Sequence, residues 1–370
     1  MTRVWDGIKI GRLELRNRFM RSATAEYLAD AVSGAPDPRL AGMYRELAVG
    51  EVALIVTGHV CVNPSGRTNR WMASMADDAL ITPWRKVIRP AQEQGAKVVL
   101  QINHGASNIV GDVVDDPISP SGVQTREGLT PRAMTEQELL DLIGDYGKAA
   151  WRAKEAGFDG VQIHAAHGYL ISQFLSPWTN QREDAWGGDA GGREAFLREA
   201  IQSVRQQVGD DYPVWAKLGF AGSAKSGLTF DLGARAAALC AQEGVECIEL
   251  SHGLGVPESI DLSIDVAYRT IAAAAREAVG PQQPLALVSG MRSLEAMNEV
   301  VDSGLAQMVS LCRPFIAQPH LVRDLRTGAG KVACVRCDRC YRDTENGGLG
   351  CANKVVGRRV AAMEEQAASQ

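Results

Sequence analysis

Eight short apolar segments recur along the chain, and a segment with helical periodicity follows each of the first seven. The expected strands are Phe19–Thr24, Ala53–Gly58, Lys97–Asn103, Gly160–His164, Val214–Leu218, Cys247–Ser251, Leu285–Ser289 and Met308–Leu311. The expected helices are Pro38–Gly50, Asp77–Gln94, Thr135–Ala156, Arg193–Val208, Asp231–Glu243, Ser263–Val279 and Leu294–Ser303. Apolar strands that alternate with helices indicate a parallel sheet covered on its outer side. Eight such units predict an α/β fold of the (β/α)₈ TIM barrel type.

Two local signals support this fold. Thr135 and Glu138 form a capping box, which marks the start of one expected helix. The first strand is not followed by Gly-x-Gly-x-x-Gly, so the fingerprint of a dinucleotide-binding Rossmann domain is missing where it should stand. A doubly wound sheet is therefore the poorer fit.

The chain has 370 residues, more than the roughly 250–300 at which a single core stops growing. Beyond Leu325 the composition changes to a segment rich in glycine and cysteine, and then to a polar tail. We therefore expect the barrel over residues 1–325 and a cysteine-containing C-terminal extension with a polar tail over residues 326–370.

Charge and hydropathy exclude several classes of partner. The formal charge of −5 gives no reason to expect a nucleic acid. No stretch approaches the roughly 18 apolar residues of a membrane span. The N-terminus is charged throughout and lacks the apolar region of a secretory signal. These features predict a cytoplasmic protein with no membrane partner.

Polar side chains gather at the carboxyl ends of the expected strands, where a barrel places its reacting groups. His164 and His167 follow the fourth strand, and Tyr169 comes directly behind them. Two histidines at this spacing can simply pack a loop, but Tyr169 and the charged run up to Asp184 favour a site. His59, His104 and His252 also follow strand ends. We expect these three to surround the site, with His104 as the first candidate for a direct role.

Four further residues suit a planar, partly anionic ligand. Gln101 can donate to and accept from an amide-like edge, and Lys217 can stabilise negative charge that develops on a ring. Gly290 and Arg313 follow the last two strands, where barrels commonly bind phosphate. A phosphorylated flavin meets all of these demands.

Long motifs then carry a resemblance to a known family. They are Asn17-Arg18-Phe19-Met20-Arg21-Ser22-Ala23-Thr24, His164-Ala165-Ala166-His167-Gly168-Tyr169-Leu170, Phe174-Leu175-Ser176-Pro177, Asn180-x-Arg182-x-Asp184 and Ser310-Leu311-Cys312-Arg313-Pro314-Phe315. With them the chain resembles the Old Yellow Enzyme family of FMN-dependent oxidoreductases, in its NADH:flavin oxidoreductase and 2,4-dienoyl-CoA reductase-like branch. The resemblance covers about four-fifths of the chain.

The resemblance implies a set of cofactor contacts. The isoalloxazine ring of FMN would touch Ala23, Thr24, Gly58 and Gln101. Lys217 would lie near the N1/O2 edge of the ring, and Gly290 and Arg313 would hold the ribityl phosphate. Glu26 would repel an anionic reduced flavin, so we expect it to point away or to pair with an arginine.

The resemblance also implies catalytic roles. His164 and His167 would bind the electron-withdrawing oxygen of an activated alkene, so that hydride from reduced N5 attacks the β-carbon. Tyr169 would deliver a proton to the α-carbon. NAD(P)H would reduce the flavin first in the same pocket, which gives ping-pong kinetics. Tyr27 is a further candidate for facing the substrate, and Arg182 and Asp184 are expected to pair and brace the loop after the fourth strand.

The eight cysteines fall into two groups. Cys61, Cys240, Cys247 and Cys312 are scattered and are expected to be buried small apolar side chains. The metal-site candidates are Cys334, Cys337, Cys340 and Cys351, which crowd into 18 residues. The 2,4-dienoyl-CoA reductases carry a four-cysteine [4Fe–4S] segment at this place. Here two of the gaps are one residue shorter, and we expect no flavin- and nucleotide-binding half to supply electrons. A closed Cys₄ zinc site and four free thiols stay as alternatives.

The sequence thus predicts an FMN-dependent NAD(P)H oxidoreductase that reduces enones and similar alkenes. One alternative is an amine dehydrogenase or demethylase of the trimethylamine dehydrogenase type, although the His/His/Tyr set suits an oxyanion better than an amine cation. The other is an FMN subunit that passes electrons to a separate partner. A homo-oligomer is expected, because in some relatives the C-terminal segment reaches a neighbouring subunit. The natural alkene and the choice between NADH and NADPH are not predicted.

Overall fold

Eight parallel strands close into a barrel in the computed structural model, which describes residues 3–110, 113–328, 332–341 and 348–368. The barrel strands are β3 (Phe19–Arg21), β4 (Leu54–Val56), β6 (Lys97–Asn103), β9 (Gly160–Ala165), β10 (Val214–Ala221), β11 (Ile248–His252), β12 (Leu285–Val288) and β13 (Met308–Leu311). Strand β3 pairs with both β4 and β13, and β4 also pairs with β6, which closes the ring. The predicted TIM barrel is confirmed.

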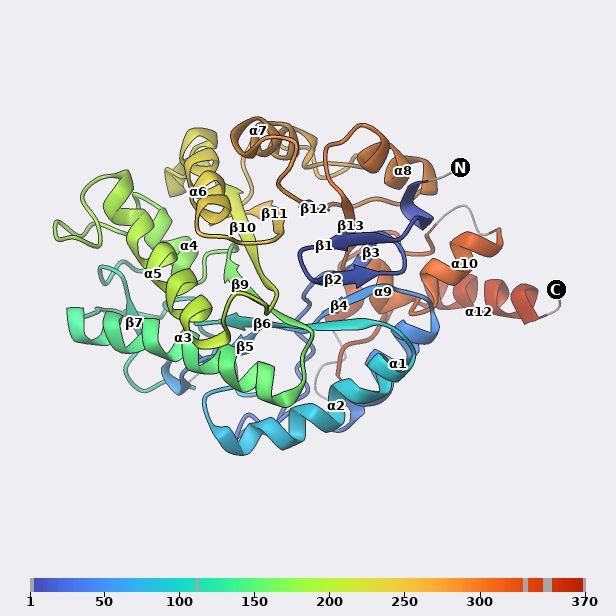
Figure 1. The fold of residues 1–370 in the computed structure, drawn as a ribbon, viewed down its shortest axis with the longest axis horizontal. Coiled ribbons are helices and arrows are strands. Elements are labelled where there is room, and N and C mark those ends of the chain that lie inside the picture. The colour runs from blue at the N-terminus through green and yellow to red at the C-terminus, as the bar shows by residue number, and fades with distance from the viewer. Residues whose placement is uncertain (1–2, 111–112, 329–331, 342–347, 369–370) are drawn as a thin grey trace.

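Helices surround the strands, as Figure 1 shows. The expected ones are α1 (Arg39–Val49), α2 (Ile81–Glu93), α3 (Glu136–Ala156), α5 (Ala190–Val208), α6 (Phe230–Gln242), α7 (Arg269–Val279) and α8 (Leu294–Asp302). Thr135 caps α3 through the predicted box with Glu138. The predicted start of a helix at Ser263 is wrong, because α7 begins at Arg269. Residues 262–264 belong to a loop that precedes α7. Their carbonyl oxygens accept hydrogen bonds from Arg336.

Other α-helices and 3₁₀ turns stand before, between and after these elements. The additional α-helices are α4 (Leu170–Leu175), α9 (Arg313–Ala317), α10 (Leu321–Thr327) and α12 (Lys354–Ala368). The 3₁₀ turns are η1 (Arg3–Trp5), η2 (Pro64–Gly66), η3 (Asp78–Leu80), η4 (Ala224–Ser226) and η5 (Arg339–Tyr341). Helix α12 lies beside α10 (Figure 1), and its Val356 and Val360 pack with Ala333 and Ala317. The predicted boundary between the barrel and the C-terminal extension, at residue 325, falls inside α10 and stays a prediction.

A hairpin of β1 (Ile8–Ile10) and β2 (Leu13–Leu15) covers the amino-terminal end of the barrel. Ile10, Leu13 and Leu15 are buried against apolar side chains inside the barrel, among them Trp215 and Met308. This apolar plug leaves the opposite end of the strands for polar groups.

Strand pairing and hydrogen bonds from Arg182 hold parts of the loop between β6 and α3. Short strand β5 (Val60–Cys61) pairs with β6, and β7 (Ile118–Ser119) pairs with β8 (Arg132–Ala133). Arg182 donates to both oxygens of Asp184 and to the carbonyl oxygens of Pro120 and Met134, at 2.9 Å and 2.7 Å. The expected Arg182–Asp184 pair is therefore confirmed, and the two carbonyl acceptors connect the loop after β9 to the loop between β6 and α3. Within the described residues, no helix combines the length and the apolar character that crossing a membrane requires.

Candidate active site

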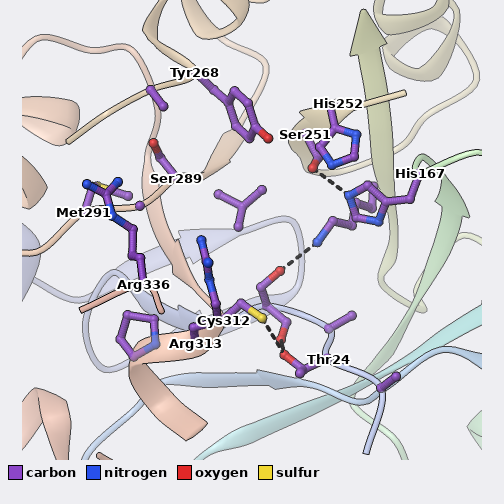
Figure 2. A pocket seen from close by; sticks show the side chains of 18 of the residues that line it. Thr24, His167, Ser251, His252, Tyr268, Ser289, Met291, Cys312, Arg313 and Arg336 are labelled. Atoms are coloured by element: carbon purple, nitrogen blue, oxygen red, sulfur yellow. Dashed lines mark hydrogen bonds between the residues drawn. The ribbon is translucent and has the colours of Figure 1, made fainter. Parts of the chain in front are cut away.

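A cavity of about 420 Å³ opens at the carboxyl ends of the barrel strands (Figure 2). Its wall includes all but one of the predicted catalytic, substrate-binding and flavin-binding residues. These are Ala23, Thr24, Tyr27, Gln101, His164, His167, Tyr169, Lys217, Gly290 and Arg313. These ten residues come from six of the eight barrel strands or from the loops that follow them.

Gly58 is the exception, because it lies outside the wall of this cavity. Its amide donates to Glu26 Oε1 at 2.8 Å, and any side chain at Gly58 would collide with that carboxylate. Glu26 also pairs with Arg21 at 2.9 Å and accepts from Tyr44 at 2.8 Å. The expectation that Glu26 pairs with an arginine is confirmed, and the same cluster explains why Gly58 faces away from the site.

The floor of the cavity is a polar layer centred on Glu249, which the sequence analysis missed. Glu249 Oε1 accepts from Ser22 Oγ at 2.6 Å and Ser310 Oγ at 2.7 Å, and it pairs with Lys217 Nζ at 3.2 Å. Lys217 also donates to Ser22 Oγ at 2.7 Å. Burial pushes the pKa of Glu249 up, but Lys217 and the hydroxyl donors outweigh burial and hold that pKa below its ordinary value. The Lys217 ammonium is therefore fixed in place by a buried carboxylate.

The same carboxylate orients Gln101. Glu249 Oε2 accepts from Gln162 Nε2 at 3.0 Å, so the other side of the Gln162 amide presents its oxygen. Gln101 Nε2 donates to that oxygen at 2.7 Å. The relay leaves Gln101 Oε1 and one N–H of its amide for a ligand.

The opposite part of the wall is a cluster of aromatic rings that can form hydrogen bonds. The His164 ring lies 5.2 Å from the His167 ring and 4.9 Å from the Tyr169 ring. The amide of Ala166 donates to His164 Nδ1 at 3.2 Å, so the proton of a neutral His164 sits on Nε2. His167 Nε2 bonds to Ser251 Oγ at 2.7 Å (Figure 2). His167 has a left-handed backbone with φ 60, a strain that collects at functional sites.

Two of the histidines expected around the site also line the cavity. The His59 ring lies 4.9 Å from Tyr169, and the His252 ring lies 4.7 Å from His167. His104, the expected exception, instead faces Ser65 Oγ and the amide of Ala106, at 3.1 Å each. The preference for His104 was wrong, because its ring turns into the neighbouring loop.

Cations gather at another side of the cavity. Arg313 and Arg336 lie across from His167 in Figure 2, and Arg292 and Gly290 also belong to this part of the wall. Ser289 Oγ is buried there without a hydrogen-bond partner among the described residues. Cys312, expected to be a buried apolar side chain, is half-buried in the wall with its Sγ 3.0 Å from Thr24 Oγ1.

These features match FMN as the expected occupant. An amide edge and an ammonium form the floor, and cations with an unpartnered hydroxyl stand where a phosphate is expected. The volume is within the range of cofactor pockets. Gln101 and Lys217 would face the ring, and Gly290 and Arg313 would face the phosphate.

The histidines of this region should make the fold sensitive to acid. Burial lowers the pKa of His59 from 6.5 to about 4 and that of His104 to about 3. Unfolded histidines bind protons below pH 6.5, whereas these stay neutral until the pH approaches 4, so acid favours the unfolded state in this window. We expect the free energy of unfolding to fall by about 3 kcal/mol through His59 alone as the pH drops through it.

Urea unfolding across this pH range measures the effect. His104→Gln removes one buried imidazole outside the cavity, so its pH profile should be flatter than that of the parent protein. Parallel profiles for the two proteins would show that His104 does not contribute to the acid sensitivity.

The four clustered cysteines line one small cavity next to the larger one. Cys334 and Arg313 belong to the walls of both. Cys337 is exposed, and a hydrogen bond from Asn353 lowers its pKa, whereas burial raises the pKa of Cys340 to about 11. Among the described residues, no three His, Cys, Asp or Glu side chains form a group that could hold a metal ion. A cluster or zinc at Cys334, Cys337, Cys340 and Cys351 therefore stays a prediction.

Comparison with known proteins gives consistent matches. The model of the NADH:flavin oxidoreductase / NADH oxidase family matches residues 4–331. An NADPH dehydrogenase of Bacillus subtilis is 31% identical, over 85% of this chain and 92% of its own length. A metal reductase of Desulforamulus reducens is 30% identical over 92% of this chain, which spans about half (51%) of that protein's length. The structure of an old yellow enzyme homologue from Zymomonas mobilis superposes with a TM-score of 0.78 at 24% identity, covering 90% of this chain and 95% of that one. That likeness concerns the fold.

Proposed function

The chain belongs to the NADH:flavin oxidoreductase / NADH oxidase family, the Old Yellow Enzyme family that its motifs indicate, and from this we infer its reaction. We propose that it uses FMN and NAD(P)H to reduce activated C=C bonds such as those of enones. Members of the family bind FMN and take NAD(P)H as reductant.

One observation carries the proposal: the charge of the cavity wall. Among the described residues that form it, there are four cationic side chains and no carboxylate, and Glu249, Asp265 and Asp338 pair with three of these cations from outside the wall. Burial holds the pKa values of His164 and His167 well below their ordinary value, so both imidazoles are neutral donors. Such a wall favours a phosphorylated, electron-rich occupant and an oxygen that gains negative charge, and it disfavours an amine cation. The amine dehydrogenase alternative is therefore the weaker candidate.

Each residue then has a task. Bound FMN supplies the chemistry of hydride transfer, from NAD(P)H to the alkene. His164 donates from Nε2 to the electron-withdrawing oxygen of the alkene, with His167 beside it. Burial raises the pKa of Tyr169, so its hydroxyl stays protonated and can give a proton to the α-carbon. Lys217, fixed by Glu249, stabilises negative charge at the floor.

Separated half-reactions test the proposal. The full chain is reduced anaerobically with NADH or NADPH, and 2-cyclohexenone is then added while the flavin absorbance is followed. Reoxidation with formation of cyclohexanone supports the proposal. A flavin that is reduced but not reoxidised by the enone contradicts alkene reduction, and flavin reduction by trimethylamine alone would favour the amine dehydrogenase.

Phenols provide a second test, because they mimic the oxygen of the substrate. His164→Ala combined with His167→Ala should weaken phenol binding by about tenfold to hundredfold, since donors to a charged oxygen are lost. His320→Gln, which lies outside the cavity and bonds to Glu46 at 3.0 Å, serves as the control. Titration by flavin absorbance gives the dissociation constants. Equal phenol affinity in all three proteins would count against an oxyanion site at these histidines.

The four clustered cysteines support a second candidate, an FMN subunit that passes electrons to a partner. It rests on the four thiols around one small cavity that shares Cys334 and Arg313 with the flavin cavity. Anaerobic purification followed by metal analysis distinguishes the possibilities. Iron with sulfide would favour an electron carrier, whereas zinc or no metal would leave a self-contained reductase.

A further inference from the structure

Arg336 and Cys334 are the described residues of the cysteine segment, Cys334–Cys340, that line the large cavity, and Arg336 is the charged one. It lies between two of the clustered cysteines in sequence, yet its guanidinium is part of the cavity wall (Figure 2). A side chain at Gly290 would collide with Arg336 Nη1, so the two share the end of the cavity where phosphate is expected.

The guanidinium is held in one position. Nη1 donates to the carbonyl oxygens of Leu262 and Ile264 at 3.0 Å each, and Nη2 donates to that of Ser263 at 2.5 Å. These bonds use three of the five N–H groups of an arginine and leave two for a ligand. Neutral carbonyl acceptors do not cancel its charge, and the carboxylate of Asp265 is 3.8 Å away. The arginine is therefore held mainly by neutral acceptors, and Asp265, its partner in this long ion pair, pairs more closely with Arg292, at 3.0 Å.

The backbone supports a special role. Arg336 has φ 54, a left-handed conformation that is uncommon for a residue with a side chain. Tyr27 and His167, two other residues of the cavity wall, share it with φ 54 and φ 60. Such strain persists where surrounding structure over-determines it, as at ligand sites.

A second bond ties the same segment to this end of the cavity. Asp338 accepts from Arg313 Nη1 at 2.5 Å. The cysteine segment thus orients Arg313 through Asp338, and it also contributes Arg336 to the cavity wall.

We propose that Arg336 binds the phosphate group of the flavin and that the cysteine segment thereby completes the cofactor site. The inference rests on the proposed use of FMN, and it adds a residue from outside the barrel strands. It also assigns the segment a task that does not require electron transfer: retention of the cofactor by a charge at its phosphate end.

Two flavins that differ only in the phosphate test the proposal. Dissociation constants of FMN and riboflavin are measured by fluorescence quenching on the full chain after reversible removal of flavin. Arg336→Ala should weaken FMN by about tenfold to hundredfold, because charge-assisted bonds to phosphate are lost. Riboflavin affinity should stay unchanged. The loss of FMN affinity should shrink at high salt. The FMN affinity of Arg336→Lys should lie between those of the parent protein and Arg336→Ala, because lysine keeps the charge and loses the planar fork.

Arg339→Ala is the matched control, because it removes the same charge from the same segment at a position outside the large cavity. It should leave both affinities unchanged. Unaltered FMN binding in Arg336→Ala overturns the inference, and so does an equal loss for FMN and riboflavin, which would mean that Arg336 only closes the cavity. If Arg336→Ala does not fold, Arg336→Lys and the salt dependence decide the question in the same way. Failure of the parent protein to bind FMN would instead overturn the proposed function.

Discussion

Replacing Tyr169 with phenylalanine is expected to slow enone reduction by about 10²–10⁴-fold and to leave flavin reduction by NAD(P)H unchanged. The hydroxyl is the proton donor that the proposal requires, and hydride transfer from the nicotinamide needs no such donor. Burial raises the pKa of Tyr169, and its ring is fixed 4.9 Å from the rings of His59 and His164. Anaerobic stopped-flow measurement of each half-reaction gives the two rates separately.

Tyr268→Phe is the matched control. Tyr268 is a second buried tyrosine of the cavity wall, with its ring 6.3 Å from His252. It should leave both rates close to those of the parent protein. Equal slowing of the two half-reactions in Tyr169→Phe would indicate general damage to the cavity and would remove Tyr169 from the role of proton donor.

Replacing Glu249 with leucine is expected to lower the free energy of unfolding by about 3–5 kcal/mol, because it leaves Lys217 buried without its partner. Both side chains are buried, at 0% and 2% exposure, and Glu249 is the carboxylate with which Lys217 pairs, at 3.2 Å. Ser22 and Ser310 would lose their acceptor at the same time. Urea unfolding measures the loss.

Double replacement separates the ion pair from the packing. Lys217→Met with Glu249→Leu removes both charges, so most of the loss should be recovered. Glu277→Gln, at an exposed glutamate of α7, should change stability little. A double variant as unstable as Glu249→Leu alone would mean that the unpaired lysine is not the cause.

The sequence predicted the barrel well because its strands are apolar and its helices are long and periodic. The strands Lys97–Asn103 and Met308–Leu311 were predicted with the bounds that the structure has. The loop at residues 263–268 was taken for helix because its partner, Arg336, lies far along the chain. Local periodicity contains no information about backbone carbonyl groups that accept hydrogen bonds from a distant arginine.

The candidate site was predicted where strand ends alone determine position. Gln101, His164 and Lys217 lie on the neighbouring parallel strands β6, β9 and β10, so a barrel must bring them together. His59 and His104 follow strand ends in the same way, and only the turn after each strand decides which ring faces the cavity. The signal for Glu249 was present but unused: a carboxylate in an apolar strand, two residues from Ser251, faces the inside of the barrel with it.

The apolar plug formed by β1 and β2 has a consequence for exchange with the solvent. In the part of the barrel that the structure describes, Ile10, Leu13 and Leu15 close the far side of the floor, so water approaches Lys217 from the mouth. A ligand that fills the cavity then covers the route by which the ammonium exchanges its hydrogens. The lifetime of those hydrogens in heavy water becomes a measure of how long the ligand remains bound.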